Sequence, residues 1–260
     1  MIAEKDIINK LADVPLAFLD NAATNDRKRF AILFLLGHNW EKPSFILTKR
    51  SRFVPQPGDI SFPGGAIDPS LDISFAGRIR QGLVPVYDAD IGKGISCHRE
   101  MSLLTATALR EAGEEIGICP SDVSIKGILP PYDLKIFAKK IVPIVGKVTR
   151  EWQVALSEEV ERLVELPLSA FFNEENYVRL EISHGVGRST FPAIAIPNNS
   201  DDDILWGATL FIIEDFLRRC FNFHFPEWRD KRLVSRILDE RYLYGENADG
   251  RVRRLNPGEK

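Results

Sequence analysis

The sequence predicts an α/β fold, because strand-like runs alternate with segments of helical periodicity. The strand-like runs occupy residues 29–36, 44–48, 123–128, 141–148 and 191–196, and the first two are strongly apolar. In the segment that follows the second run, Leu104, Ala108 and Ala112 recur four residues apart, as on one face of a helix. A second helix is expected to open at residue 204 and to continue through Arg219, with an apolar face made of Leu210, Ile213, Phe216 and Leu217.

The composition excludes several classes of protein. The chain has 260 residues and a formal net charge of -3, which gives no broad basic surface for nucleic acid. No apolar run reaches the length of a membrane span, and the first ten residues are too polar for a signal peptide. The three cysteines are widely spaced and form no metal-binding pattern, so we expect reduced thiols in a cytoplasmic protein.

The N-terminal region is expected to hold an amphipathic helix at residues 7–19, followed by a polar turn. The first two apolar runs predict a hairpin, because the segment between them contains Gly, His, Asn and Pro.

An acidic cluster lies at the end of the predicted helix that contains Leu104, Ala108 and Ala112. Glu111, Glu114 and Glu115 are i, i+3 and i+4, so their carboxylates crowd one side of the helix and repel one another. A divalent cation with oxygen ligands offsets this repulsion, and Arg110 can orient a carboxylate by a charge-assisted hydrogen bond. The alternative is a solvated acidic helix end. Gly117 stands where a helix end favours a left-handed residue.

The segment Phe62-Pro63-Gly64-Gly65 lies upstream, and together with residues 110–118 it resembles the Nudix box. The second part, Arg-Glu-Ala-Gly-Glu-Glu-Ile-Gly-Ile, matches the pattern of that box with Ala112 at its aliphatic position. The resemblance implies an α/β/α sandwich in which a mixed sheet lies between helices and the box forms a loop-helix-loop. It also implies an enzyme that directs water onto a diphosphate bond.

The same resemblance implies roles for individual residues. Mg²⁺ or Mn²⁺ would be held by Glu111, Glu114 and Glu115, with the carbonyl of Gly65 completing the shell. Glu114 or Glu115 would also serve as the catalytic base, and Arg110 would orient the carboxylates.

A second resemblance extends upstream of the box. Residues 46–51 and 58–65 are similar to the signature of the coenzyme A pyrophosphatase branch of Nudix hydrolases. The substrate implied is coenzyme A or an acyl derivative, a nucleotide-linked small molecule. The chain departs from the signature at Gln56-Pro57, where a His is usual, at Asp59, where Gln or Glu is usual, and in a spacer one residue shorter. Hydrolysis of ADP-ribose or a dinucleotide, and a non-catalytic ligand sensor on the same fold, therefore stay as alternatives.

Substrate-binding residues are expected in the same region. Lys49, Arg50 and Arg52 form a basic run, and Arg50 and Arg52 are the candidates for binding substrate phosphate. The alternative is a solvated loop. Gly64 lacks a Cβ, which permits close approach of a diphosphate or a metal to the backbone.

The spacing inside the box is unusually long. Many more residues separate Asp72 from Arg110 than the box requires, and residues 73–95 are expected to be a loop-like insertion. It would act as a lid or specificity element, as a neutral surface excursion or as a contact between subunits. Asp72, or alternatively Asp68, takes the place of the first Glu of the box.

Further acids follow the box at Glu158 and Glu159, one of which would be an additional metal ligand or base. The alternative is a solvated helix start next to Ser157. The domain prediction is an N-terminal lead-in at 1–28, a Nudix domain at 29–220 and a C-terminal extension at 221–260. The extension would pack on the domain or form a homodimer.

Overall fold

The computed structural model describes residues 9–11, 28–87, 98–134, 139–184, 187–197, 203–238 and 240–246. The helices are α3 (Pro69–Arg80), α5 (Arg99–Ile116), α6 (Gly207–Phe221) and α7 (Glu240–Tyr244). Short 3-10 turns occupy Pro120–Asp122, Leu168–Phe172 and Glu174–Asn176. The strands are β1 (Lys28–Leu36), β2 (Ser44–Arg50), β3 (Ile60–Ser61), β4 (Gly64–Ala66), β5 (Val123–Ile128), β6 (Tyr132–Leu134), β7 (Lys139–Val148), β8 (Val160–Pro167), β9 (Tyr177–His184), β10 (Gly187–Ala195), β11 (Ile204–Trp206) and β12 (Leu233–Ile237).

A mixed sheet forms the centre of the molecule. Its main order is β3-β2-β1-β7-β5, and β4, β6 and β8 pair with β1, β7 and β2 respectively. The predicted hairpin is confirmed, since β1 and β2 pair antiparallel, whereas β1 and β7 are parallel. Alternate side chains of β1 enter two separate cores, with Leu33 in one and Phe34 in the other. A strand covered on both faces needs this continuous apolar sequence.

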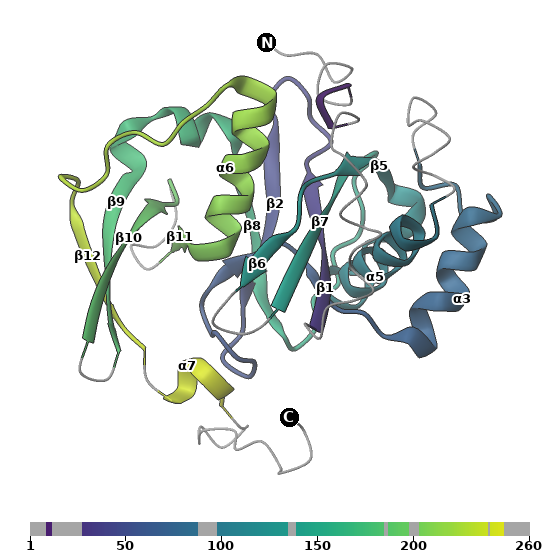
Figure 1. The fold of residues 1–260 in the computed structure, drawn as a ribbon, viewed down its shortest axis with the longest axis horizontal. Helices are drawn as coiled ribbons and strands as arrows, with labels where there is room; N and C mark the ends of the chain where they lie inside the picture. Colours follow the sequence, from purple (N-terminus) through teal and green to yellow (C-terminus); the bar gives the residue numbers. More distant parts are fainter. Residues whose placement is uncertain are drawn as a thin grey trace.

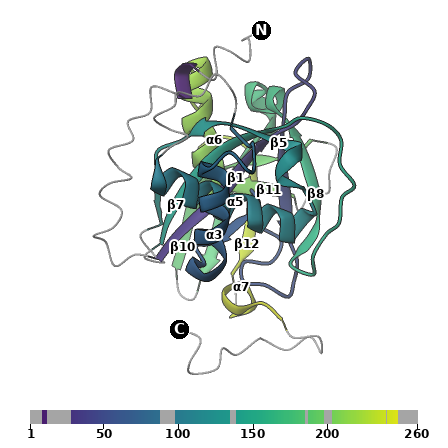
Figure 2. The same cartoon turned by 90° about the vertical axis from the view of Figure 1, so that its right-hand side faces the viewer.

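Helices α5 and α3 cover one face of this sheet (Figure 2). Helix α5 contributes Leu104, Ala108 and Ala112 to the core on that side, as the four-residue spacing predicts. The helix ends at Gly117, which has a φ of 70° and is left-handed, as expected.

A second sheet, of order β11-β10-β9-β12, lies beyond the other face of the central sheet. Helix α6 lies between the two sheets (Figure 1). Phe216 on this helix contacts Phe34 of β1, and the same core includes Tyr177 and Ile194 of the second sheet. The α/β class and the sheet between helices are thus confirmed, with the second sheet as an addition.

Three sequence predictions are corrected. Residues 73–80 are helical rather than loop-like, because Asp68 caps α3, Pro69 opens it, and Asp72, Ala76 and Ile79 form its buried face. Residues 204–206 are strand β11, since the edge of β10 offers them backbone partners; the helix starts only at Gly207. Glu158 and Glu159 lie in a turn that leads into β8, not at a helix start.

Other predictions fall partly outside the described residues. Of the helix expected at 7–19, residues 9–11 are described and are helical. Of the insertion, residues 88–95 lie outside the described part. The domain boundaries stay a prediction.

The C-terminal extension packs on the rest of the chain. Strand β12 pairs in parallel with β9, and Phe223 is buried in the core beside α6. No described helix is both long and apolar enough to cross a membrane.

Candidate functional site

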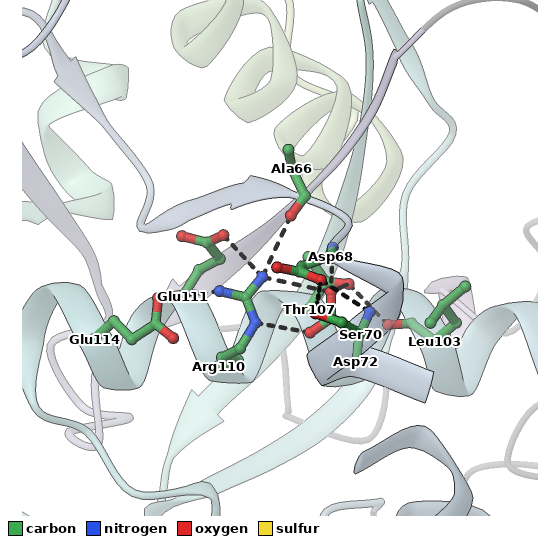
Figure 3. Close-up of polar contacts among 9 residues, drawn as sticks. All are labelled: Ala66, Asp68, Ser70, Asp72, Leu103, Thr107, Arg110, Glu111 and Glu114. Carbon is green, nitrogen blue, oxygen red and sulfur yellow. Dashed lines mark hydrogen bonds and ion pairs between the residues drawn. The ribbon is translucent and has the colours of Figure 1, made fainter. Parts of the chain in front are cut away.

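Arg110 is the centre of a polar network on α5 (Figure 3). Its guanidinium donates to Asp72 at 2.7 Å, to Glu111 at 2.9 Å and to Glu114 at 3.0 Å. It also donates to the carbonyl of Ala66 in β4 at 3.3 Å. Burial lowers the pKa of Arg110, but its carboxylate partners raise that pKa by more. Arg110 therefore stays charged and orients the carboxylates, as the sequence resemblance implies.

Of the two candidates for the first acid of the box, Asp72 is the one that pairs with Arg110. Its side chain is fully buried, and it accepts hydrogen bonds from Thr107 Oγ1 at 2.7 Å and from the backbone N–H of Asp68 at 2.8 Å. Asp68 is instead the N-cap of α3. The ion pair between Asp72 and Arg110 thus joins α3 to α5. Thr107 was missed from the sequence, although it lies one turn before Arg110 on the same helix.

The two glycines of β4 bring the backbone close to the helix. A Cβ on Gly65 would lie 2.6 Å from Oε2 of Glu111, so a larger residue would displace this carboxylate. Gly64 has a φ of +153°, which favours glycine, and a Cβ there would meet Ile32 of the neighbouring strand β1. Its N–H donates to the carboxylate of Glu115.

Glu115 is the most buried of the three acids. Its relative exposure is 8%, and burial raises its pKa to about 8, although the Arg50 charge and the Gly64 N–H oppose this shift. The charges of Glu111 and Glu159 raise the pKa further. Burial also raises the pKa of Glu111. A buried carboxyl held among other carboxyls is an environment that favours a bound cation or proton.

Of the two downstream acids, Glu159 approaches the helix. Its charge raises the pKa of both Glu111 and Glu115. The turn that carries it is fixed by Ser51, whose N–H donates to the Glu159 carbonyl at 2.8 Å and whose hydroxyl donates to the Glu158 carbonyl at 2.6 Å. The end of β2 therefore places Glu159 beside the box.

The two candidate phosphate-binding arginines, Arg50 and Arg52, lie in different surroundings. Arg50 is close enough to Glu115 to lower its pKa, and its Nε donates to the carbonyl of Pro55 at 2.8 Å. Arg52 lies over the ring of Phe53 and lines a different cavity, which the C-terminal extension helps to form. If β2 continued, Arg50 and Arg52 would point to the same face, because side chains alternate along a strand. The strand ends at Arg50, however, so the position of Arg52 depends on the turn that follows.

The carboxylates of Glu111, Glu115 and Glu159 are oxygen donors, the kind of ligand that a hard divalent cation prefers. Glu114 is different: it is half exposed and its carboxylate is paired with Arg110. Among the described residues, no three carboxylate, imidazole or thiol groups converge at metal-binding distance. The assignment of individual ligands therefore stays a prediction.

Similar proteins define the class of enzyme. An uncharacterized Nudix hydrolase NudL of Citrobacter koseri is 30% identical over 202 residues, which are 75% of this chain and 84% of that protein. A relative of the same name from an Enterobacter species is 34% identical over 159 residues, 60% of this chain and 66% of that protein, just under two thirds of its length. No family model matches the chain. The chain belongs to the Nudix hydrolase family, and as a member it is a diphosphatase.

Solved structures give weaker likenesses. A Nudix hydrolase from Nitrosomonas europaea has a TM-score of 0.41 and 13% identity, covering 82% of this chain and 81% of that one. The Ap4A hydrolase of C. elegans has a TM-score of 0.35 and 18% identity, covering 52% of this chain and 77% of that one.

Proposed function

We propose that this enzyme hydrolyses the diphosphate of coenzyme A or an acyl-coenzyme A. The products would be adenosine 3',5'-bisphosphate and the (acyl-)4'-phosphopantetheine. The observation that carries the proposal is the position of the upstream signature. Its Arg50 lies near Glu115, and its Gly64 and Gly65 pack against Glu115 and Glu111. The segment that resembles the coenzyme A branch is thus part of the same site as the box.

Different residues of the site would bind the metal ion, position the carboxylates and contact the substrate. Glu111, Glu115 and Glu159 would hold Mg²⁺ or Mn²⁺, with the Gly65 carbonyl as a further ligand. The bound ion would neutralise charge on the phosphate oxygens and lower the pKa of water. Arg110 and Asp72 would fix the helix carboxylates, and Arg50 would contact the diphosphate.

Glu115 or Glu114 would act as base. Glu115 has the better position, because it is buried among the other acids with a pKa near the working range of an acid–base catalyst. Glu114 is paired with Arg110 toward solvent. We also propose a cytoplasmic location and no nucleic-acid or membrane partner, in keeping with the charge and the cysteine content of the chain.

Product analysis tests the substrate. The purified protein would be incubated with coenzyme A, ADP-ribose or diadenosine polyphosphates, each with Mg²⁺ or Mn²⁺. Adenosine 3',5'-bisphosphate formed from coenzyme A alone supports the proposal. AMP formed from ADP-ribose or a dinucleotide, without turnover of coenzyme A, would assign another substrate within the family. No turnover of any of them would favour a ligand sensor.

A further inference from the structure

A cavity of about 360 Å³ opens between the loop that follows β2 and the C-terminal extension. Its cationic side chains come from both sides: Lys49 and Arg52 from β2 and the loop, Arg236 and Arg241 from β12 and α7. Glu246 is the carboxylate among its lining residues. The lining therefore carries an excess of positive charge.

The cations differ in how far they are neutralised. The Nζ of Lys49 lies 3.2 Å from Glu161 and 3.1 Å from the buried Asp203, so its charge is compensated. Arg52 is exposed and stacks on the ring of Phe53, with its guanidinium carbon 4.9 Å from the ring centroid. Within the described part of the chain, Arg52 forms no ion pair. Its donors are therefore accessible to a ligand.

Two arginines of the extension, Arg236 and Arg241, line the cavity from the other side. Arg236 lies 3.7 Å from Asp59, and Arg241 lies 3.6 Å from Glu246. Both residues therefore add a positive charge to the lining of the cavity.

The cavity is held in shape by bonds between its two sides. Tyr242 donates its hydroxyl to Asp59 at 2.7 Å and accepts at its carbonyl from the N–H of Gln56 at 2.7 Å. The N–H of Glu246 donates to the carbonyl of Arg52 at 2.8 Å. The extension is thus docked backbone to backbone on the loop, and a ligand would meet a preorganised site.

Arg50 links this cavity to the carboxylates of the box. Its backbone N–H donates to the Asp59 carbonyl at 2.9 Å, and its carbonyl accepts from Gly58, a lining residue, at 2.9 Å. Its side chain acts electrostatically on Glu115 and on Asp59. The cavity and the carboxylates of the box therefore both adjoin Arg50.

We propose that this cavity binds a phosphomonoester on the nucleoside half of the substrate, with Arg52, Arg236 and Arg241 as its ligands. Guanidinium groups suit a phosphomonoester because they donate two parallel hydrogen bonds to its oxygens. The inference rests on the proposed function, since the adenosine 3',5'-bisphosphate half of coenzyme A carries such a group. It makes the C-terminal extension a determinant of specificity.

The test compares coenzyme A with 3'-dephospho-coenzyme A in the presence of Mg²⁺. For the wild-type enzyme we expect kcat/KM to favour coenzyme A by about 10- to 100-fold, as for a charged hydrogen-bonding group. Arg52→Gln and Arg241→Gln should move this ratio toward one, chiefly by raising KM for coenzyme A. Arg229→Gln is the matched control, because this arginine lies on the same extension, is exposed and pairs with Glu227 outside the cavity.

A wild-type ratio near one, or an unchanged ratio in Arg52→Gln, would overturn the inference while leaving coenzyme A hydrolysis intact. If coenzyme A is not hydrolysed at all, calorimetric titration with adenosine 3',5'-bisphosphate and with AMP still decides. Tighter binding of the bisphosphate that is lost in Arg52→Gln supports the cavity as a phosphate site. Equal affinities for the two nucleotides, or a preference that Arg52→Gln retains, count against it.

Discussion

Glu115 is buried, yet its carboxyl group would have to be ionised to bind a metal ion. In the metal-free protein its carboxyl has a pKa of about 8, against an ordinary value of 4.5. The folded state therefore holds a proton that the unfolded state releases. As a consequence, this group lowers the free energy of unfolding progressively as pH rises from the ordinary pKa to the folded pKa.

The variant Glu115→Gln should separate activity from stability. We expect kcat to fall by about two orders of magnitude or more, since an essential charge is removed. In EDTA, the variant should melt at a higher temperature than the wild type at about pH 8.5, with a smaller difference at about pH 5. Scanning fluorimetry at the two pH values and a turnover assay measure both effects.

Glu158→Gln is the control for this prediction, because its side chain is exposed in the same turn as Glu159. It should leave both quantities near those of the wild type. If Glu115→Gln turned over substrate with Mg²⁺ as fast as the wild type, a catalytic or metal-binding role for this acid would be refuted.

Asp72 and Asp68 form a second informative pair. Asp72 is buried against Arg110, so Asp72→Asn leaves the guanidinium short of a charge and should lower the free energy of unfolding by about 3 kcal/mol. Asp68→Asn retains a good N-cap and should change it by less than about 0.5 kcal/mol. Urea denaturation measures both variants. If both variants lost the same free energy of unfolding, the ion pair between Asp72 and Arg110 would not contribute specifically to stability.

At the scale of elements, the short strand β4 must lie almost in contact with helix α5. Gly65→Ala would put a methyl group 2.6 Å from Oε2 of Glu111 and displace that carboxylate. We expect kcat/KM to fall by about 10-fold or more, because small displacements of catalytic groups are costly. Steady-state kinetics at saturating Mg²⁺ measure the loss.

Gly77→Ala in α3 is the matched glycine control. A Cβ there meets no atom within 4 Å, so the variant should gain about 0.5–1 kcal/mol of stability from a better helix former. Its kinetics should be those of the wild type. If Gly65→Ala behaved in the same way, close contact between strand and helix would not limit the reaction.

At the scale of the whole molecule, α6 holds the two sheets together through aromatic side chains. The ring of Phe216 is fully buried and lies 4.8 Å from that of Phe34 and 6.0 Å from that of Phe45, measured between centroids. Phe216→Ala should destabilise the protein by about 3–5 kcal/mol, the usual cost of emptying an aromatic position in a core.

Phe172→Ala removes a ring that is 52% exposed and should cost less than about 1 kcal/mol. Chemical denaturation of the two variants compares them. Similar losses would show that the contact between the sheets does not depend on the Phe216 ring.

The same scale explains two of the three departures from the coenzyme A signature, those at Gln56 and Asp59. Gln56 has a left-handed φ of 61°, and its N–H binds the carbonyl of Tyr242. Asp59 accepts from the hydroxyl of Tyr242 and from Trp206 at 3.1 Å. Both unusual residues therefore anchor elements that come later in the chain, and neither contact is visible in the local sequence.

Local periodicity and short spacing in the sequence were enough to predict several features of the fold and the site. The apolar runs became β1, β2, β5, β7 and β10, and the four-residue repeat became α5 with its glycine end. Arg110 with Glu111 and Glu114 followed as well, since neighbours on one helix are fixed by its geometry. Residues 73–80 were wrongly predicted to be a loop. They form a capped helix, but its buried face is narrow, so its sequence resembles that of a polar loop.

Contacts between groups that are distant in the sequence became visible only in the folded chain. Asp72 meets Arg110, the charge of Glu159 reaches Glu115, and Arg52 lines the cavity beside the C-terminal extension. Asp59 and Tyr242, which are 183 residues apart, are joined by a hydrogen bond. Such contacts depend on sheet register and on the packing of whole elements, so no local pattern of residues encodes them.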